Sequence, residues 1–120
     1  MAPTKVLIVP LSNQPQFLPL VHNLSNRLRL LGISNNIDSS NASIGKRYSR
    51  NDELGTPLGV TVDFQTLADG TVTLRERDTT QQVRGKEDEI IQAIRNLIDG
   101  TESWDLVSQR LPPFSNEDNE

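Results

Sequence analysis

The segment SIGKRYSRNDELGTPLGVTVDF, residues 43–64, joins two elements of different character. Its first part is rich in charged side chains and predicts a helix over residues 43–54 that ends at Gly55, a residue that favours the left-handed conformation found after a helix. Its second part, LGVTVDF, contains the β-branched and apolar residues typical of a buried strand. A charged helix directly before a core strand is compatible with two hypotheses: a solvated helix face, or a surface that binds another charged molecule.

The sequence before this segment predicts a βαβ unit. The apolar run TKVLIVPL, residues 4–11, is typical of a strand that is covered on both faces. Apolar residues recur at steps of three and four over residues 15–31, which predicts an amphipathic helix that ends at Gly32. The segment ISNNID, residues 33–38, then predicts a second strand that runs parallel to the first.

The sequence after this segment predicts two more strands and two helices. The Asp69-Gly70 pair is typical of a hairpin turn, so TVTLRERD is expected to return antiparallel to the strand before it. TTQQVRG predicts a short fifth strand, and the apolar spacing predicts a helix over residues 86–98 that is capped by Gly100. A last short helix is expected with Thr101 as its N-cap.

Together these elements predict an α/β fold, namely a three-layer α/β/α domain with a mixed five-stranded sheet. Residues 1–111 are expected to form this domain, and residues 112–120 an acidic, flexible C-terminal tail.

The composition excludes several classes of protein. The 120 residues include no cysteine, which excludes thiolate zinc fingers, redox pairs and thiol nucleophiles. No apolar run approaches the roughly 20 residues that a membrane-spanning helix requires. The formal net charge is −4, but residues 87–120 alone carry two basic and nine acidic side chains, a net −7. The rest of the chain is therefore slightly basic, which suits selective contacts to a few phosphates and base edges better than coating of a polyanion.

No constellation of catalytic or metal-binding residues is visible in the sequence. His22 is the single histidine, and because it lies near the inward stripe of the predicted first helix, a packed or capping role is expected rather than a catalytic one. No carboxylate lies at metal-ligand spacing from His22. The Gly45-Lys46 pair lacks the other residues of a phosphate-binding loop. The sequence therefore predicts no catalytic residue, no metal and no cofactor for this chain by itself.

The predicted return strand carries the most informative polar pattern. Arg75 and Arg77 are two positions apart, so both are expected on one face, followed by Asp78, Gln82 and Arg84. On an exposed sheet edge, such guanidinium, carboxylate and amide groups could recognise single-stranded bases. The alternative is an edge strand whose charges only prevent aggregation.

Two motifs, SIGKRYSRNDELGTPLGVTVDF and TVTLRERDTTQQVR, together resemble the C-terminal anticodon-binding domain of eukaryotic-type glycyl-tRNA synthetases, which are class II enzymes. The resemblance extends from KVLIVPLS to WDLVSQRLPPF and implies the same three-layer fold. It implies that the domain recognises glycine tRNA within a homodimeric parent enzyme, whose catalytic domain uses ATP and Mg²⁺ to attach glycine. It also implies residence in the cytoplasm, or in mitochondria for a mitochondrial form, with no membrane partner.

The resemblance also implies roles for individual positions. Lys46 and Arg50 would hold phosphate. Apart from the resemblance, Tyr48 on the predicted charged helix is the aromatic residue best suited to stack on a base. The positions implied to bind the anticodon are Arg47, Asp63, Arg75, Arg77, Asp78, Gln82 and Arg84. One alternative remains open, a protein-interaction or regulatory module that keeps the fold without binding tRNA; the sequence does not support a further candidate, a small-molecule-binding domain. The latter would need a Gly-rich loop after the first strand, where the sequence has SNQPQF.

Overall fold

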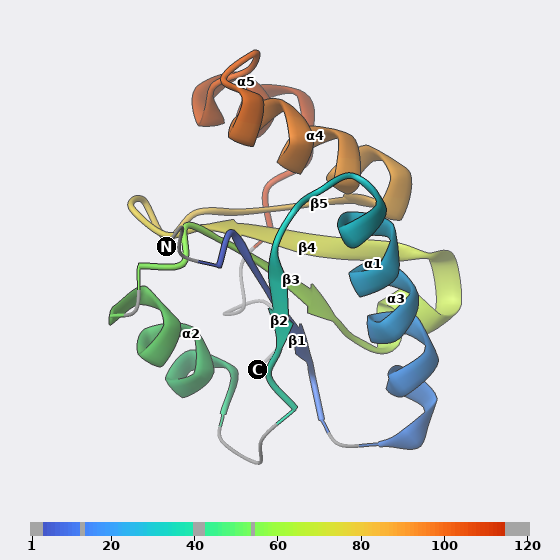
Figure 1. Cartoon of the computed structure of the whole chain (residues 1–120). Coiled ribbons are helices and arrows are strands. Elements are labelled where there is room, and N and C mark those ends of the chain that lie inside the picture. Colours follow the sequence, from blue (N-terminus) through green and yellow to red (C-terminus); the bar gives the residue numbers. More distant parts are fainter. Residues whose placement is uncertain (1–3, 13, 40–42, 54, 115–120) are drawn as a thin grey trace.

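The computed structural model describes residues 4–12, 14–39, 43–53 and 55–114 (Figure 1). In order, the elements are β1 (Val6–Pro10), the 3₁₀ helix η1 (Pro15–Phe17), α1 (Leu18–Leu30), β2 (Asn35–Ile37), α2 (Ile44–Glu53), β3 (Leu58–Val62), α3 (Phe64–Asp69), β4 (Thr71–Glu76), β5 (Gln82–Lys86), α4 (Glu87–Asp99) and α5 (Trp104–Arg110). Strands and helices alternate from β1 to β4, after which β5 follows β4 directly and two helices end the order.

The strands form one mixed sheet in the order β2-β1-β3-β4-β5. β1 pairs in parallel with both β2 and β3, while β4 pairs antiparallel with both β3 and β5. The predicted five-stranded mixed sheet and its parallel first pair are therefore confirmed. The edge strands are β2 and β5, so the expectation that the return strand β4 lies on an exposed edge is wrong.

Alternation along the strands produces two buried layers. Val6 and Ile8 of β1 belong to the large core that includes residues of α1, α4 and α5, while Leu7 and Val9 face Tyr48 of α2 on the other side. Figure 1 shows α4 and α5 above the sheet and α2 below it. The predicted three-layer architecture is confirmed.

The connection between β3 and β4 differs from the prediction. Instead of a hairpin at Asp69-Gly70, the chain forms the short helix α3, and Gly70 is its C-cap with φ +75°. Asp63 begins this helix, since its carboxylate accepts from the Thr66 backbone N–H at 3.1 Å and the Thr66 hydroxyl accepts from the Asp63 N–H at 3.1 Å. An Asp-Gly pair fits a hairpin and a left-handed helix end equally well, and here the capping box decides.

Two smaller predictions are also wrong. The N-cap of α5 is Ser103, whose hydroxyl accepts a hydrogen bond from the Leu106 N–H at 3.4 Å. Thr101, the predicted N-cap, instead lies after the C-terminus of α4, where its N–H donates to the Asn96 carbonyl at 3.0 Å. His22 is exposed on α1, so it does not pack inward.

The segment after α5 lies along the edge strand. The Arg84 N–H donates to the Pro112 carbonyl and the Phe114 N–H to the Gln82 carbonyl, both at 2.9 Å. Residues 112–114 therefore run beside β5, with an antiparallel bridge between Val83 and Pro113. The boundary expected after residue 111 stays a prediction, and residues 115–120 of the expected tail lie outside the described residues.

Candidate nucleic-acid interface

The sheet face toward α2 changes from apolar to polar across the strands. On β1, Leu7 and Val9 contact Tyr48. Alternate positions along a strand point to the same side of a sheet. The residues of β4 and β5 that point to this face are all polar. We call this surface the polar face; it consists of Thr71, Thr73, Arg75, Gln82, Arg84 and Lys86.

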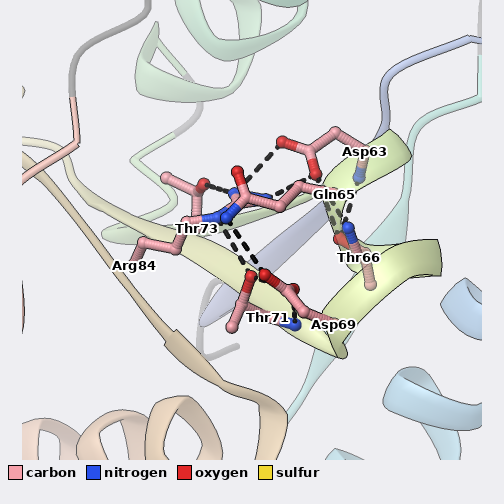
Figure 2. A network of polar contacts seen from close by, with 7 residues as sticks. All are labelled: Asp63, Gln65, Thr66, Asp69, Thr71, Thr73 and Arg84. Atoms are coloured by element: carbon pink, nitrogen blue, oxygen red, sulfur yellow. Dashed lines mark hydrogen bonds and ion pairs between the residues drawn. The ribbon is translucent and has the colours of Figure 1, made fainter.

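Arg84 and Asp63 form the fixed centre of the polar face (Figure 2). The guanidinium holds the carboxylate with two bonds, Nη1 to Oδ2 at 3.1 Å and Nη2 to Oδ1 at 2.5 Å. It also donates to the hydroxyls of Thr73 at 2.8 Å and Thr71 at 3.1 Å. The side chains of Arg84 and Asp63 are only 8% and 17% exposed. This buried bidentate ion pair connects β5 to the junction of β3 and α3. It forms a rigid base of the polar face, which we call its floor.

Arg75 stacks on Tyr48 beside this centre. The Arg75 Cζ atom lies 4.6 Å from the centroid of the Tyr48 ring, and the Tyr48 hydroxyl shares a 2.7 Å hydrogen bond with that of Thr61. The ring sits directly on the backbone of Gly59, where a Cβ would come within 2.1 Å of it. Tyr48 is therefore buried, and the half-buried Arg75, in place of the predicted tyrosine, is the planar group on the outer side.

Gln82 lies at one end of the polar face, near Arg77 and Asp78 at the end of β4, and Asp78 also lines a cavity beside Trp104. Arg77 is the first residue after β4, and its guanidinium lies near Gly55, between α2 and β3. Its expected position on the same face as Arg75 stays a prediction. Its Nε donates to the Asp78 carboxylate at 3.2 Å, and the Asp78 side chain is 75% exposed. Gln82 is half-buried and stands opposite Arg75 in the register of β4 and β5.

The three basic residues of α2 have different surroundings. Lys46 is exposed, and Arg50 is exposed but bonds the Asp38 carboxylate at 3.1 Å. Arg47 is only 1% exposed. Its guanidinium donates to three backbone carbonyls, those of Pro10 at 2.7 Å, Asp38 at 2.9 Å and Leu11 at 3.3 Å.

Burial lowers the pKa of Arg47 below its ordinary value. Arg47 is therefore too buried to contact a nucleotide. Its hydrogen bonds instead attach α2 to the end of β1. The expectation that it binds the anticodon is therefore replaced by a structural role.

Several residues of this region were not singled out by the sequence. Thr71, Thr73 and Lys86 complete the polar face, and Phe114 covers Arg84 with its ring centroid 5.0 Å from Cζ. The alternation of polar and small or apolar residues in QVRGK was a signal that could have identified Lys86. Among the described residues, there is no metal-ligand cluster and no helix with the length and apolar character needed to cross a bilayer.

Comparisons with known proteins give a consistent result. A profile of the family described as anticodon binding domain matches residues 5–97. A Schizosaccharomyces pombe protein provisionally named glycine–tRNA ligase is 60% identical over 113 residues, covering 94% of this chain and 17% of that protein. Glycine–tRNA ligase 1, mitochondrial, of Saccharomyces cerevisiae is 52% identical over 113 residues, covering 94% of this chain and 16% of that protein. The chain therefore spans about a sixth of the length of these curated relatives.

The fold also recurs among solved structures. Prolyl-tRNA synthetase from Cryptosporidium parvum, complexed with L-proline and AMP, superposes with a TM-score of 0.75 at 20% identity. The match covers 82% of this chain and 21% of that chain.

Proposed function

The chain belongs to the anticodon-binding domain family, and from that premise we propose that it recognises glycine tRNA through the anticodon loop. The observation that carries the proposal is the polar face itself. It offers a guanidinium plane at Arg75 and an amide at Gln82, both partly accessible, above a floor fixed by Arg84 and Asp63. The exposed side chains of Lys46, Arg50 and Lys86 supply positive charge that attracts a phosphate backbone.

In this proposal, base recognition falls to the side chains with paired donors and acceptors. Arg75 donates to base edges or stacks on a base, and the Gln82 amide both donates and accepts. Asp78 accepts from the amino group of cytosine, the kind of base that a glycine anticodon supplies. Lys46, Arg50 and Arg77 contact phosphates and set the position of the loop.

Asp63 and Arg84 act differently from the direct contacts first expected of them. Because the four hydrogen bonds of Arg84 to Asp63, Thr71 and Thr73 occupy its guanidinium, the pair shapes the floor on which bases lie. Such preorganisation lowers the conformational cost of binding.

The relatives support a proposal about the parent enzyme. We infer that this domain serves a longer, homodimeric glycine–tRNA ligase whose catalytic domain, in the same chain, attaches glycine with ATP and Mg²⁺. The cytoplasm is the proposed location, and the mitochondrial name of one relative makes a mitochondrial form of the parent compatible with the same domain.

A filter-binding comparison tests the proposal. Wild-type glycine tRNA and a version with an exchanged anticodon are titrated with the chain at low salt. We expect tighter retention of the wild-type tRNA. Equal retention, or none of either RNA, would favour the alternative of a protein-interaction or regulatory module built on the same fold.

A further inference from the structure

Two cavities of similar size on this molecule have opposite charge. The first, of about 510 Å³, lies at the outer edge of β5; its described lining has three cationic side chains, Arg84, Lys86 and Arg110, and one anionic, Glu89. The second, of about 560 Å³, lies beside Trp104; its described lining has one cationic side chain, Lys5, and three anionic ones, Glu76, Asp78 and Asp105. Only the first has the sign of charge that attracts a phosphate backbone.

The first cavity continues the polar face. Thr71, Arg84 and Lys86 belong to both, and the cavity extends from there to Gln65 of α3 and Phe114 of the last described segment. Figure 2 shows Gln65 and Arg84 on neighbouring elements beside Thr71. A loop of RNA lying on the polar face would therefore reach this cavity without leaving the protein surface.

The walls combine three kinds of group that bind a nucleotide: an aromatic ring, an amide and a cation. Phe114 presents a half-exposed ring whose position is fixed by its 2.9 Å backbone bond to Gln82 and by contact with Arg84. The Gln65 amide nitrogen donates to Asp69 at 3.1 Å, which orients the amide and leaves its carbonyl oxygen as an acceptor. The exposed ammonium of Lys86 stands at the rim.

The remaining charges of this cavity are engaged within the protein. The Glu89 carboxylate accepts from the Lys86 backbone N–H at 3.1 Å. Arg110 donates twice to Glu102, at 2.8 and 2.9 Å. Lys86 is therefore the cation best placed to meet a phosphate at the rim.

We propose that this cavity binds one unstacked nucleobase of the tRNA anticodon loop. The base stacks on the ring of Phe114, a donor on its edge bonds the carbonyl of Gln65, and its phosphate lies against Lys86. A cavity of this volume is in the range of natural small-ligand sites. The inference rests on the proposed function, since it assigns a place to one nucleotide of the same RNA.

A double-mutant cycle between protein and RNA tests the inference. Binding of the glycine anticodon stem-loop to the chain is measured by fluorescence anisotropy at low salt, with an abasic nucleotide at each loop position in turn. Phe114→Leu, which removes the ring but keeps an apolar side chain, should weaken binding about tenfold, the size of one base–aromatic stack. At one loop position the abasic lesion should cost the same factor, and the two changes together should cost no more than either alone.

A second variant guards against a structural effect of Phe114→Leu on Arg84. Gln65→Ala should weaken binding of the intact stem-loop by roughly fivefold. It should not weaken binding of the stem-loop with the abasic nucleotide at the position identified with Phe114→Leu. Gln92→Ala is the matched control, because Gln92 is also an exposed helical glutamine that donates to a residue four positions on, Asn96, but lies on α4 outside the cavity. It should leave binding unchanged.

The outcomes separate this inference from the proposed function. If the chain distinguishes the wild-type anticodon from an exchanged one, but the effects of Phe114→Leu and Gln65→Ala multiply with those of every abasic lesion, the cavity holds no base and only this inference is overturned. If the exchanged anticodon binds equally well, the proposed function fails and the inference fails with it.

Discussion

Replacing Arg47 with methionine should destabilise the protein without removing a contact to RNA. The substitution keeps an unbranched apolar stem but removes the guanidinium that joins α2 to the carbonyls of Pro10, Asp38 and Leu11. Two of these bonds have ordinary lengths, 2.7 and 2.9 Å, and the third, at 3.3 Å, is long. We therefore count two of them in the expected loss.

A hydrogen bond with a charged donor contributes about 1.5–3 kcal/mol. Removal of the buried charge restores part of that loss, because its desolvation is no longer required. We expect a net loss of about 2–4 kcal/mol in the free energy of unfolding, which for a domain of this size lowers the melting temperature by roughly 8–16 °C.

Urea unfolding followed by circular dichroism measures this loss, and Lys46→Ala is the matched control one residue away. Lys46 is exposed, so its removal should change stability by less than about 0.5 kcal/mol. It should instead lower the salt dependence of RNA binding by about one phosphate contact. An Arg47→Met variant that unfolds at the wild-type urea concentration would refute the structural role assigned to Arg47.

Two further predictions concern the packing and the pH dependence of the domain. Gly59→Ala would drive a Cβ into the Tyr48 ring, so it should cost about 1–3 kcal/mol in urea unfolding, and the cost should fall when Tyr48→Ala is added; an additive double variant would contradict the contact. The hydrogen bonds from Arg110 hold the pKa of Glu102 below its ordinary value, so the ionised carboxylate stabilises the fold at neutral pH and this contribution is lost as pH falls through the lowered pKa. Glu102→Gln should accordingly flatten the decline of stability below about pH 4 in urea titrations, and an unchanged slope would contradict this assignment.

The fold was largely predictable because its strands leave strong local patterns. The run from Val6 to Pro10 is apolar throughout, as expected for a strand buried on both faces. The helix α3 was missed because six residues are too few to show a helical spacing of apolar residues. In addition, Gly70 fits both a hairpin turn and the end of a helix. Its one clear signal was Asp63 followed three residues later by Thr66.

The site was harder to predict because its residues are defined by distant partners. Lys46 and Arg47 are neighbours with the same charge, and only the docking of α2 on β1 shows which one is buried. The pairing of Asp63 with Arg84 joins positions 21 residues apart through the register of the sheet. Phe114 follows two prolines in a segment expected to be a flexible tail, and no local pattern indicates that it covers Arg84.

The most direct test of recognition by the polar face crosses Arg75→Ala with the identity of the anticodon. Wild-type and variant forms of the glycine–tRNA ligase that we propose as the parent of this domain are titrated with glycine tRNA and with the anticodon-exchanged tRNA. We predict that the variant loses affinity for glycine tRNA by about 1–3 kcal/mol and little for the exchanged tRNA, so that discrimination collapses. An equal loss for both RNAs would show that Arg75 only contacts phosphate, and would contradict recognition of bases by this face.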